Sequence, residues 1–318
     1  MRCGWIGNHL EGLPAFEALL DAGAEIVAAL TLTPEAAAKR SGSVDYAPLC
    51  RSYDVPLHRI SDVNSPESLA VLRSLDLDVL FVIGWSQILR LDTLATARIG
   101  VVGAHASLLP KNRGSAPINW ALIRGERETG NSLLWLADGV DTGAVIDRMA
   151  IEITPFDTCA TLYERVALTN RDMLLRLWCR LLKGERPGTP QAHTDEPPLP
   201  RRRPADGLLD WRGPSNKVYD FVRALTRPYP GAFGRLGGER WTVWQAALPP
   251  LAASPVAEPG TCLGPVVSPI ADACGQLVAC GQGAVALLEV ESEHGHVLKG
   301  HELAAADWQG KSWETVND

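Results

Sequence analysis

The chain has 318 residues, 46% of them hydrophobic and 21% charged, so it is long enough for two globular domains with real cores. Its net charge of −7 argues against an extended phosphate-binding surface, and nucleic acid is therefore not a favoured partner. No apolar run approaches the ~20 residues of a membrane-spanning helix, so no membrane partner is expected either.

The cysteines and the first residues bear on the compartment. The seven cysteines are odd in number and scattered, without a C-x-x-C pair, which argues against a disulfide framework. The chain enters a short apolar run directly, without the apolar core of a signal peptide. His294, His296 and His301 follow Cys280, but their spacing matches no zinc pattern. We therefore expect a cytoplasmic protein with reduced thiols and no metal.

The first 110 residues alternate short apolar runs with helical patterns, which is typical of βαβ units. The run over residues 78–83 is nearly all apolar, as expected of a central parallel strand covered on both faces. The expected strands are 3–6, 25–32, 55–57, 78–83 and 99–102, and the expected helices are 13–22, 45–53 and 66–75. Together they predict a doubly wound, mostly parallel α/β sheet.

Two glycine-bounded turns carry the candidate chemistry. The apolar run 99–102 stops at Gly103, and His105 follows at what would be the carboxyl end of a strand, where ligands bind in open α/β sheets. A second turn, residues 137–143, carries Asp141. A histidine and an aspartate on such turns can form an acid–base pair, in which the carboxylate fixes the imidazole tautomer. The alternative is a capping histidine and a turn aspartate.

The second half of the chain contains a change of composition. A helix is expected over 116–124, strands over 132–136 and 145–153, and a long helix over 161–182. The proline-rich stretch 184–207 predicts an extended linker. A helix over 215–225 and short strands at 241–246, 261–263, 277–279 and 284–290 then predict a small β-barrel. We expect a catalytic domain over 1–204, with the linker from about 184, and a β-barrel-like domain over 205–318.

Several ordered motifs now point to one family. They are His105-Ala106-Ser107-Leu108-Leu109-Pro110 with Arg113-Gly114 and Pro117, Gly125 with Thr129-Gly130, Asp141 with Gly143, and, later, Asp210-Trp211, Arg223-Ala224, Pro228-x-Pro230-Gly231-Ala232-Phe233 and Pro259-Gly260-Thr261. With these motifs the chain resembles the 10-formyltetrahydrofolate-dependent formyltransferases, which include methionyl-tRNA formyltransferase and the sugar N-formyltransferases. The resemblance covers nearly the whole chain and implies a Rossmann-like catalytic domain followed by an OB-like barrel.

The resemblance also implies a reaction and a site. An amine would attack the formyl carbon of the co-substrate 10-formyltetrahydrofolate, and tetrahydrofolate would leave. His105 would stabilise the oxyanion or relay a proton, and Asp141 would hold the imidazole and help to take the proton of the amine. The residues implied to line the folate pocket are Trp85, Gln87, Ile88, Leu89, Ser107, Leu108, Leu109, Pro110, Asp138 and Val140.

One catalytic position departs from the family pattern. The family has an asparagine two positions before the histidine, where this chain has Gly103. Loss of one oxyanion donor typically costs ~10²–10³ in rate. Three explanations stay open: transfer with another donor, a different one-carbon reaction such as hydrolysis of 10-formyltetrahydrofolate, or folate binding without catalysis. Retention of His105 and Asp141 favours an active transferase.

The acceptor is inferred from charge. The tRNA-specific members have a basic, glycine-rich loop after the second strand, whereas residues 34–46 carry only Lys39 and Arg40 as basic residues. This favours a small-molecule amine, such as an amino sugar or a specialised-metabolite amine, with methionyl-tRNA as the alternative. His9 and Glu11 are candidates to contact the acceptor or are plain loop residues. The second domain can bind substrate, build a homodimer interface or simply pack, and the sequence does not choose.

Overall fold

The computed structural model describes residues 1–250 and 256–314. These residues form two compact units. The first comprises Met1–Ile118, Arg127–Ile153 and Thr161–Arg201, and the second comprises Asn119–Glu126, Thr154–Ala160 and the chain from Arg202 onward. None of the helices in the described ranges is both long and apolar enough to cross a membrane.

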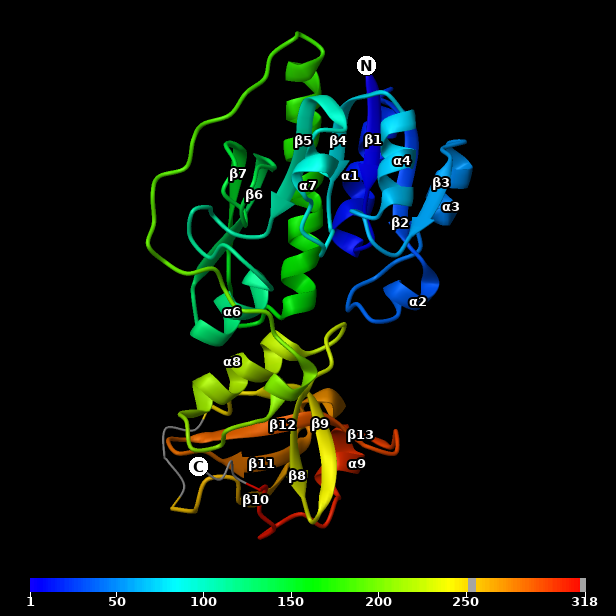
Figure 1. The fold of residues 1–318 in the computed structure, drawn as a ribbon. Coiled ribbons are helices and arrows are strands. Elements are labelled where there is room, and N and C mark those ends of the chain that lie inside the picture. The colour runs from blue at the N-terminus through cyan, green and yellow to red at the C-terminus, as the bar shows by residue number, and fades with distance from the viewer. Residues whose placement is uncertain (251–255, 315–318) are drawn as a thin grey trace. The chain divides into compact units, whose positions relative to one another are not determined.

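The first unit is built on a seven-stranded sheet of order β3-β2-β1-β4-β5-β6-β7. Its strands are β1 (Arg2–Ile6), β2 (Glu25–Leu32), β3 (Leu57–Ile60), β4 (Leu77–Val82), β5 (Ala97–His105), β6 (Glu128–Trp135) and β7 (Val145–Glu152). The first five strands in sequence pair in parallel, and β6 and β7 are antiparallel (Figure 1). The predicted doubly wound, mostly parallel sheet is thus confirmed, and the strand order reverses between β1 and β4.

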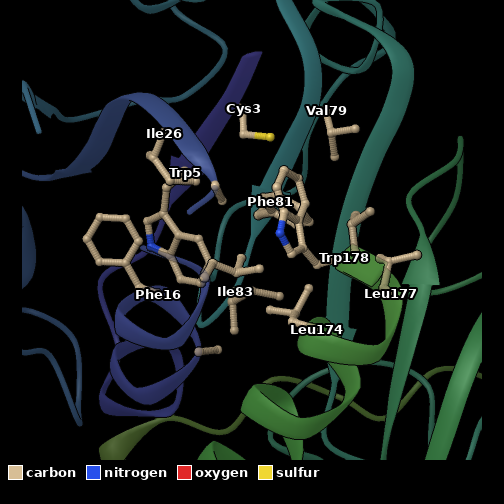
Figure 2. Close-up of a cluster of buried hydrophobic side chains, with 14 of the residues drawn as sticks. Cys3, Trp5, Phe16, Ile26, Val79, Phe81, Ile83, Leu174, Leu177 and Trp178 are labelled. Carbon is tan, nitrogen blue, oxygen red and sulfur yellow. The ribbon is translucent and has the colours of Figure 1, made fainter. Parts of the chain in front are cut away.

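Helices cover both faces of this sheet. They are α1 (Leu13–Asp21), α2 (Pro34–Ala37), α3 (Ala47–Ser52), α4 (Pro66–Ser74), α5 (Leu91–Leu94) and α7 (Cys159–Leu181), with a 3-10 turn η1 (Leu10–Gly12). Most of α6 (Pro117–Arg124) belongs to the second unit. On one face, Trp5 of β1 and Phe81 of β4 pack with Phe16 of α1 and Trp178 of α7 (Figure 2). A second cluster on the other face includes Leu72 of α4. Burial on both faces explains why β1 and β4 read as continuous apolar runs.

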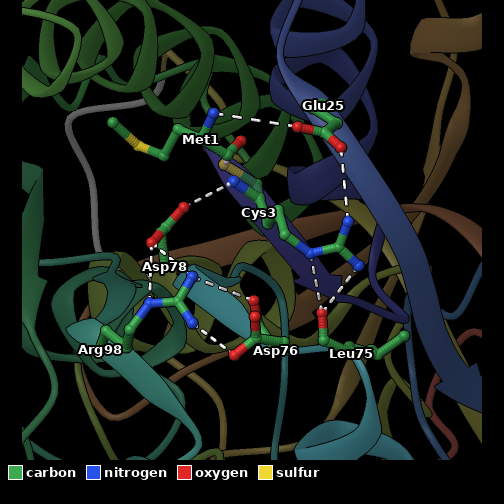
Figure 3. Close-up of polar contacts among 8 residues, drawn as sticks. Met1, Cys3, Glu25, Leu75, Asp76, Asp78 and Arg98 are labelled. Carbon is green, nitrogen blue, oxygen red and sulfur yellow. Dashed lines mark hydrogen bonds and ion pairs between the residues drawn. The ribbon is translucent and has the colours of Figure 1, made fainter.

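Charged groups gather at the amino ends of the strands. Arg98 of β5 bonds to Asp78 of β4 and to Asp76, and the Arg2 amide of β1 donates to Asp78 at 2.8 Å (Figure 3). The Arg2 guanidinium also contacts Glu25 and the Leu75 carbonyl. These partners lower the pKa of Asp78, chiefly through the Arg98 hydrogen bond. The carboxyl ends of the parallel strands lie at the opposite edge of the sheet, where glycine-containing loops follow them.

An extended segment, residues 185–200, follows α7 and is called the strap below. It lies in the proline-rich stretch expected to be a linker. In the structure it belongs to the first unit and pairs with other segments of it at two points, Val145 with Thr189 and Gly114 with Leu199. The Trp135 indole N–H also donates to the Pro187 carbonyl. The strap is therefore held by backbone bonds at both ends.

The second unit contains a six-stranded antiparallel sheet of order β10-β11-β12-β9-β8, with β13 paired to β12. The strands are β8 (Ala232–Leu236), β9 (Glu239–Ala247), β10 (Cys262–Val266), β11 (Gly275–Ala279), β12 (Ala284–Ser292) and β13 (Val297–Lys299). The other elements are η2 (Pro204–Gly207), α8 (Ser215–Leu225), η3 (Ala271–Ala273) and α9 (Gly300–Ala304). Trp211 and Trp313 are buried with ring centroids 5.4 Å apart. The prediction of a small β-rich second domain is confirmed.

Candidate functional site

His105 is the last residue of β5 and is 7% exposed. It pairs in register with Ser132 of β6. The Ser132 hydroxyl fixes the turn that follows the histidine, because it donates to the Ser107 carbonyl at 2.6 Å and accepts the Leu109 amide at 3.0 Å. The end of the strand and the start of the turn are therefore held by one buried side chain.

Both ring nitrogens of His105 face oxygen atoms. Nε2 is 2.7 Å from the Asn112 carbonyl, and Nδ1 is 3.4 Å from Oδ2 of Asp141. A carbonyl oxygen only accepts hydrogen bonds, so Nε2 carries a hydrogen. A proton between Nδ1 and the Asp141 carboxylate would give the second ring nitrogen a hydrogen-bond partner as well. The geometry thus provides a place for one exchangeable proton, and an imidazolium would find an acceptor at each nitrogen.

Asp141 occupies a strained position in its loop. Its φ is 53°, in the left-handed region that few residues other than glycine adopt, and its side chain is 21% exposed. The Gly114 amide donates to the same Oδ2 that faces the histidine, at 2.9 Å. Gly143 passes so close to Trp135 that a β-carbon would lie 1.7 Å from its carbonyl oxygen. The loop conformation therefore depends on backbone contacts as well as on the aspartate.

Gly103 lies two residues before His105, on the same face of β5. A β-carbon built on it would lie 2.5 Å from Cδ2 and 3.0 Å from Cγ of Leu136. Leu136 is partly buried, packs against two apolar clusters, and donates its amide to the Val101 carbonyl. The volume beside Gly103 is thus occupied by an aliphatic side chain.

The structure brings one group of the expected folate-pocket residues around His105. Ser107 and Leu109, in the turn after His105, are buried. Leu108 packs against Gly130, since a β-carbon built on Gly130 would lie 2.4 Å from Cδ2 of Leu108. Pro110 follows Leu109 in the same turn. Asp138 and Val140 lie on the Asp141 loop, and Val140 is 37% exposed.

The second group, residues 85–89, follows β4. Gln87 uses its amide on a neighbouring loop, accepting the Val63 amide and donating to the Ser61 carbonyl. Ile88 is 68% exposed and Leu89 is partly buried. The indole N–H of Trp85 is buried without a hydrogen-bond partner among the described residues. Since β4 and β5 are adjacent parallel strands, both groups lie at one edge of the sheet.

His9 and Glu11 lie beyond the carboxyl end of β1, next to the reversal of strand order where ligands bind in such sheets. The His9 ring lies 5.1 Å from that of Tyr163, and its Nδ1 is 3.8 Å from Oε1 of Glu11. A β-carbon on Gly84, after β4, would lie 2.8 Å from that of His9. The pair is therefore packed closely against the end of β4.

Neither the Asn112 carbonyl nor the buried Ser132 hydroxyl was expected from the sequence. The only sequence signal for the Asn112 turn is its residue type, because asparagine adopts positive φ readily. In the structure the φ of Asn112 is 57°. No group of three or more side chains suited to hold a metal ion occurs in the described part of the chain.

Solved structures that share the fold include HypX and two formyltransferases. HypX from Aquifex aeolicus matches with a TM-score of 0.67 and 17% identity over 94% of this chain and 46% of that one. WlaRD, a sugar 3N-formyltransferase solved with dTDP and 5-N-formyl-THF, matches with a TM-score of 0.64 and 12% identity over 90% and 97%. Methionyl-tRNA formyltransferase from Clostridium thermocellum matches with a TM-score of 0.58 and 18% identity over 78% and 94%. The chain spans about half the length of HypX.

Family models cover most of the sequence. The model described as "Formyl transferase" matches residues 18–177, and the model described as "Formyl transferase, C-terminal domain" matches residues 202–307. The two matches fall in the expected order. The chain belongs to the formyl transferase family.

Proposed function

We propose that this chain transfers the formyl group of 10-formyltetrahydrofolate to the amine of a small-molecule acceptor, with His105 and Asp141 as the acid–base pair. The observation that carries the proposal is the buried imidazole between the Asn112 carbonyl and the Asp141 carboxylate. Such an arrangement can take up one proton without creating an unpaired buried charge.

The pair meets the proton balance of the reaction. The amine nitrogen forms a bond to the formyl carbon and loses a proton, and the bond from that carbon to N10 of the folate breaks as N10 gains one. His105 and Asp141 take the first proton and return it to N10. The resulting imidazolium would donate to both oxygens that already face its nitrogens. Both N–H groups of this imidazolium are then engaged, and Leu136 rather than an amide lies beside Gly103, so we assign the pair to proton transfer and donation to the developing oxyanion to a group outside it.

The folate is proposed to bind along the edge formed by residues 85–89, 107–110 and 138–140. Three features support this site: the exposed apolar side chains of Ile88 and Val140, and the unpartnered buried indole N–H of Trp85. A flat heterocycle needs apolar walls and a few fixed polar groups. The structure bound to tetrahydrofolic acid, HypX from Aquifex aeolicus, shares the fold with a TM-score of 0.65.

The acceptor is proposed to enter beside His9 and Glu11. Their side chains are 14% and 18% exposed, so each can present a polar atom to a small ligand. A carboxylate suits an ammonium or a sugar hydroxyl. The net charge of −7 and the two basic residues in 34–46 are poorly suited to a tRNA acceptor stem.

The experiment is to incubate the protein with 10-formyltetrahydrofolate and a panel of amines, including amino sugars on nucleotide carriers and methionyl-tRNA, and to follow tetrahydrofolate release. Release that requires one small amine supports the proposal. Release that requires methionyl-tRNA identifies the alternative acceptor, and release without any amine indicates a hydrolase. Binding without turnover would rule out catalysis.

The acid–base assignment has its own test in the same assay. His105→Ala and Asp141→Asn should each lower kcat by about 10³-fold, the size of a general acid–base contribution, with folate binding largely retained. Turnover near the wild-type rate in either variant would show that the pair does not carry the reaction.

A further inference from the structure

The strap places the side chain of Gln191 between the two loops of the candidate site. Its Nε2 donates to the Asp141 carbonyl at 2.7 Å and to the Gly143 carbonyl at 2.8 Å. Its Oε1 accepts from Arg113, at 2.9 Å from one terminal nitrogen and 3.3 Å from Nε. The donors of Arg113 and the two carbonyls fix the orientation of the amide, which could not be reversed without losing every bond.

The neighbours of Gln191 hold it in this place. Two residues earlier, Thr189 exchanges both backbone bonds with Val145, at 2.8 and 2.9 Å. Further along the strap, the Leu199 amide donates to the Arg113 carbonyl and the Leu199 carbonyl accepts the Ser115 amide. Gln191 thus sits between two anchored points and is itself only partly exposed.

The bonds fall on the backbone that aims the acid–base pair. The two carbonyls flank Thr142 in the loop where Asp141 has a φ of 53°. Such a conformation costs of order 1–3 kcal/mol and persists only where surrounding contacts determine it. Arg113 lies on the other side of the amide, between Asn112 and Gly114 in the sequence. The Asn112 carbonyl faces His105, and the Gly114 amide donates to Asp141.

We propose that Gln191 is a positioning residue, whose single amide fixes the Asp141 loop against the His105 loop and so sets the approach of the carboxylate to the imidazole. The inference rests on the proposed roles of His105 and Asp141. It assigns a function to the proline-rich segment, because strap residues determine the geometry of a site to which they add no reacting group.

Three variants separate the contacts. Gln191→Met removes all of them at similar volume, and Gln191→Glu keeps the acceptor for Arg113 but turns a carboxylate toward the two carbonyls. His193→Ala is the matched control, because it lies two residues further along the strap with its side chain 87% exposed. We expect the Met and Glu variants to lower kcat by roughly 10- to 100-fold with KM for the folate within about threefold, since small misplacements cost this much in rate. The control should match the wild type.

Hydrogen–deuterium exchange supplies a readout besides activity. Peptides covering residues 136–144 should exchange faster in Gln191→Met and Gln191→Glu than in the wild type. Their exchange rate should be unchanged in His193→Ala. Wild-type kcat and exchange in Gln191→Glu would overturn the proposal, because the link to Arg113 alone would then suffice. If His105→Ala and Asp141→Asn retain turnover, the proposed function fails, whereas faster loop exchange in the Gln191 variants would still establish the positioning contact. If His105→Ala and Asp141→Asn lose turnover but the Gln191 variants keep wild-type kcat and exchange, the proposed function stands and only the positioning role of Gln191 is contradicted.

Discussion

At the carboxyl end of β5, Gly103 and Leu136 share one small volume. The leucine lies where any side chain at position 103 would begin, at 2.5 Å from the β-carbon site. Its partial exposure allows it to move, but movement would remove it from the two apolar clusters that it joins. The departure from the family asparagine is therefore coupled to a second residue.

This coupling predicts a non-additive pair of substitutions. Gly103→Ala should destabilise the protein by about 1–3 kcal/mol, the usual cost of overpacking. Combined with Leu136→Ala, the added methyl has room, so the double variant should be more stable than the sum of the single changes predicts. Urea unfolding of the four proteins measures the coupling, and strict additivity would contradict it.

The same geometry refines the question of the missing asparagine. Gly103→Asn alone should lower kcat, because the amide must displace Leu136 from the volume beside position 103, two residues before His105. In a Leu136→Ala background the same substitution should raise kcat relative to Leu136→Ala alone, because the amide can then donate to the oxyanion. Steady-state rates with a fixed amine test this, and a further fall in the double variant would show that the space at position 103 serves another purpose.

At the residue scale, the sequence predicted the candidate acid–base residues better than it predicted the contacts that hold them. His105 and Asp141 stood out because each follows an apolar run at a glycine-bounded turn. The carbonyl of Asn112 was missed because a main-chain contact depends on turn geometry and leaves no mark in the side-chain pattern. Gln191 was missed for a related reason, since its three partners lie about 50 and 80 positions away.

Among the elements, α8 carries a buried charged pair. Arg223 and Asp220 lie three residues apart with side chains 9% and 11% exposed. The guanidinium also donates to the carbonyls of Thr154 and Asp157, so it joins the helix to a segment of the same unit. Burial raises the pKa of Asp220, and the Arg223 hydrogen bond opposes the rise.

Removing the cation should therefore cost more than removing the anion. Arg223→Met leaves a buried carboxylate and two carbonyls without their donor, at a cost of about 3–5 kcal/mol near pH 7. Asp220→Asn keeps an acceptor for the guanidinium and should cost about 1 kcal/mol. The loss in Arg223→Met should shrink toward acid pH, because the raised pKa lets Asp220 take up a proton. Urea unfolding at pH 7 and pH 4.5 measures both, and equal losses in the two variants would contradict the argument.

Element prediction succeeded where burial imposes a pattern. Most strands of the parallel sheet appeared as apolar runs, and the long pattern over 161–182 became α7, which buries Leu174, Leu177 and Leu181. The strand expected at 55–57 lies instead at Leu57–Ile60, because His58 and Arg59 interrupt its apolar pattern. The four-residue helices α2 and α5 were not expected, nor were β8 and β13, because such short elements carry little periodicity. β5 proved longer than residues 99–102, since Arg98 and Gly103 bound the apolar run on either side.

Over the whole molecule, each unit buries its own set of apolar side chains. Composition predicted a change of architecture near the proline-rich stretch, because repeated prolines cannot continue a helix or a central strand. It could not predict that this stretch would pair with Gly114 and Val145, since isolated bridges need only one or two favourable residues. The local composition therefore gave the extended conformation but not its partners.

The acid sensitivity of the chain should depend on where its paired carboxylates lie. The pKa of Asp78 is lowered by Arg98 and the Arg2 amide, and the pKa of Asp210 by Arg212. A lowered folded pKa adds stability that is complete above the unfolded value of ~3.9 and is lost as the pH falls through the folded value. Both carboxylates therefore stabilise the folded state at pH 7.

Their contributions should nevertheless differ. Asp78 is 24% exposed and joins three strands of the first unit, whereas Asp210 is 49% exposed and pairs with a residue two positions away. We expect Asp78→Asn to cost about 1 kcal/mol at pH 7 and Asp210→Asn to cost little, as for most exposed pairs. In urea unfolding from pH 7 to pH 2.5, the difference between wild type and Asp78→Asn should narrow as Asp78 becomes protonated. A difference that stays constant would show that the substitution acts through packing, because only the charged carboxylate gives the effect its dependence on pH.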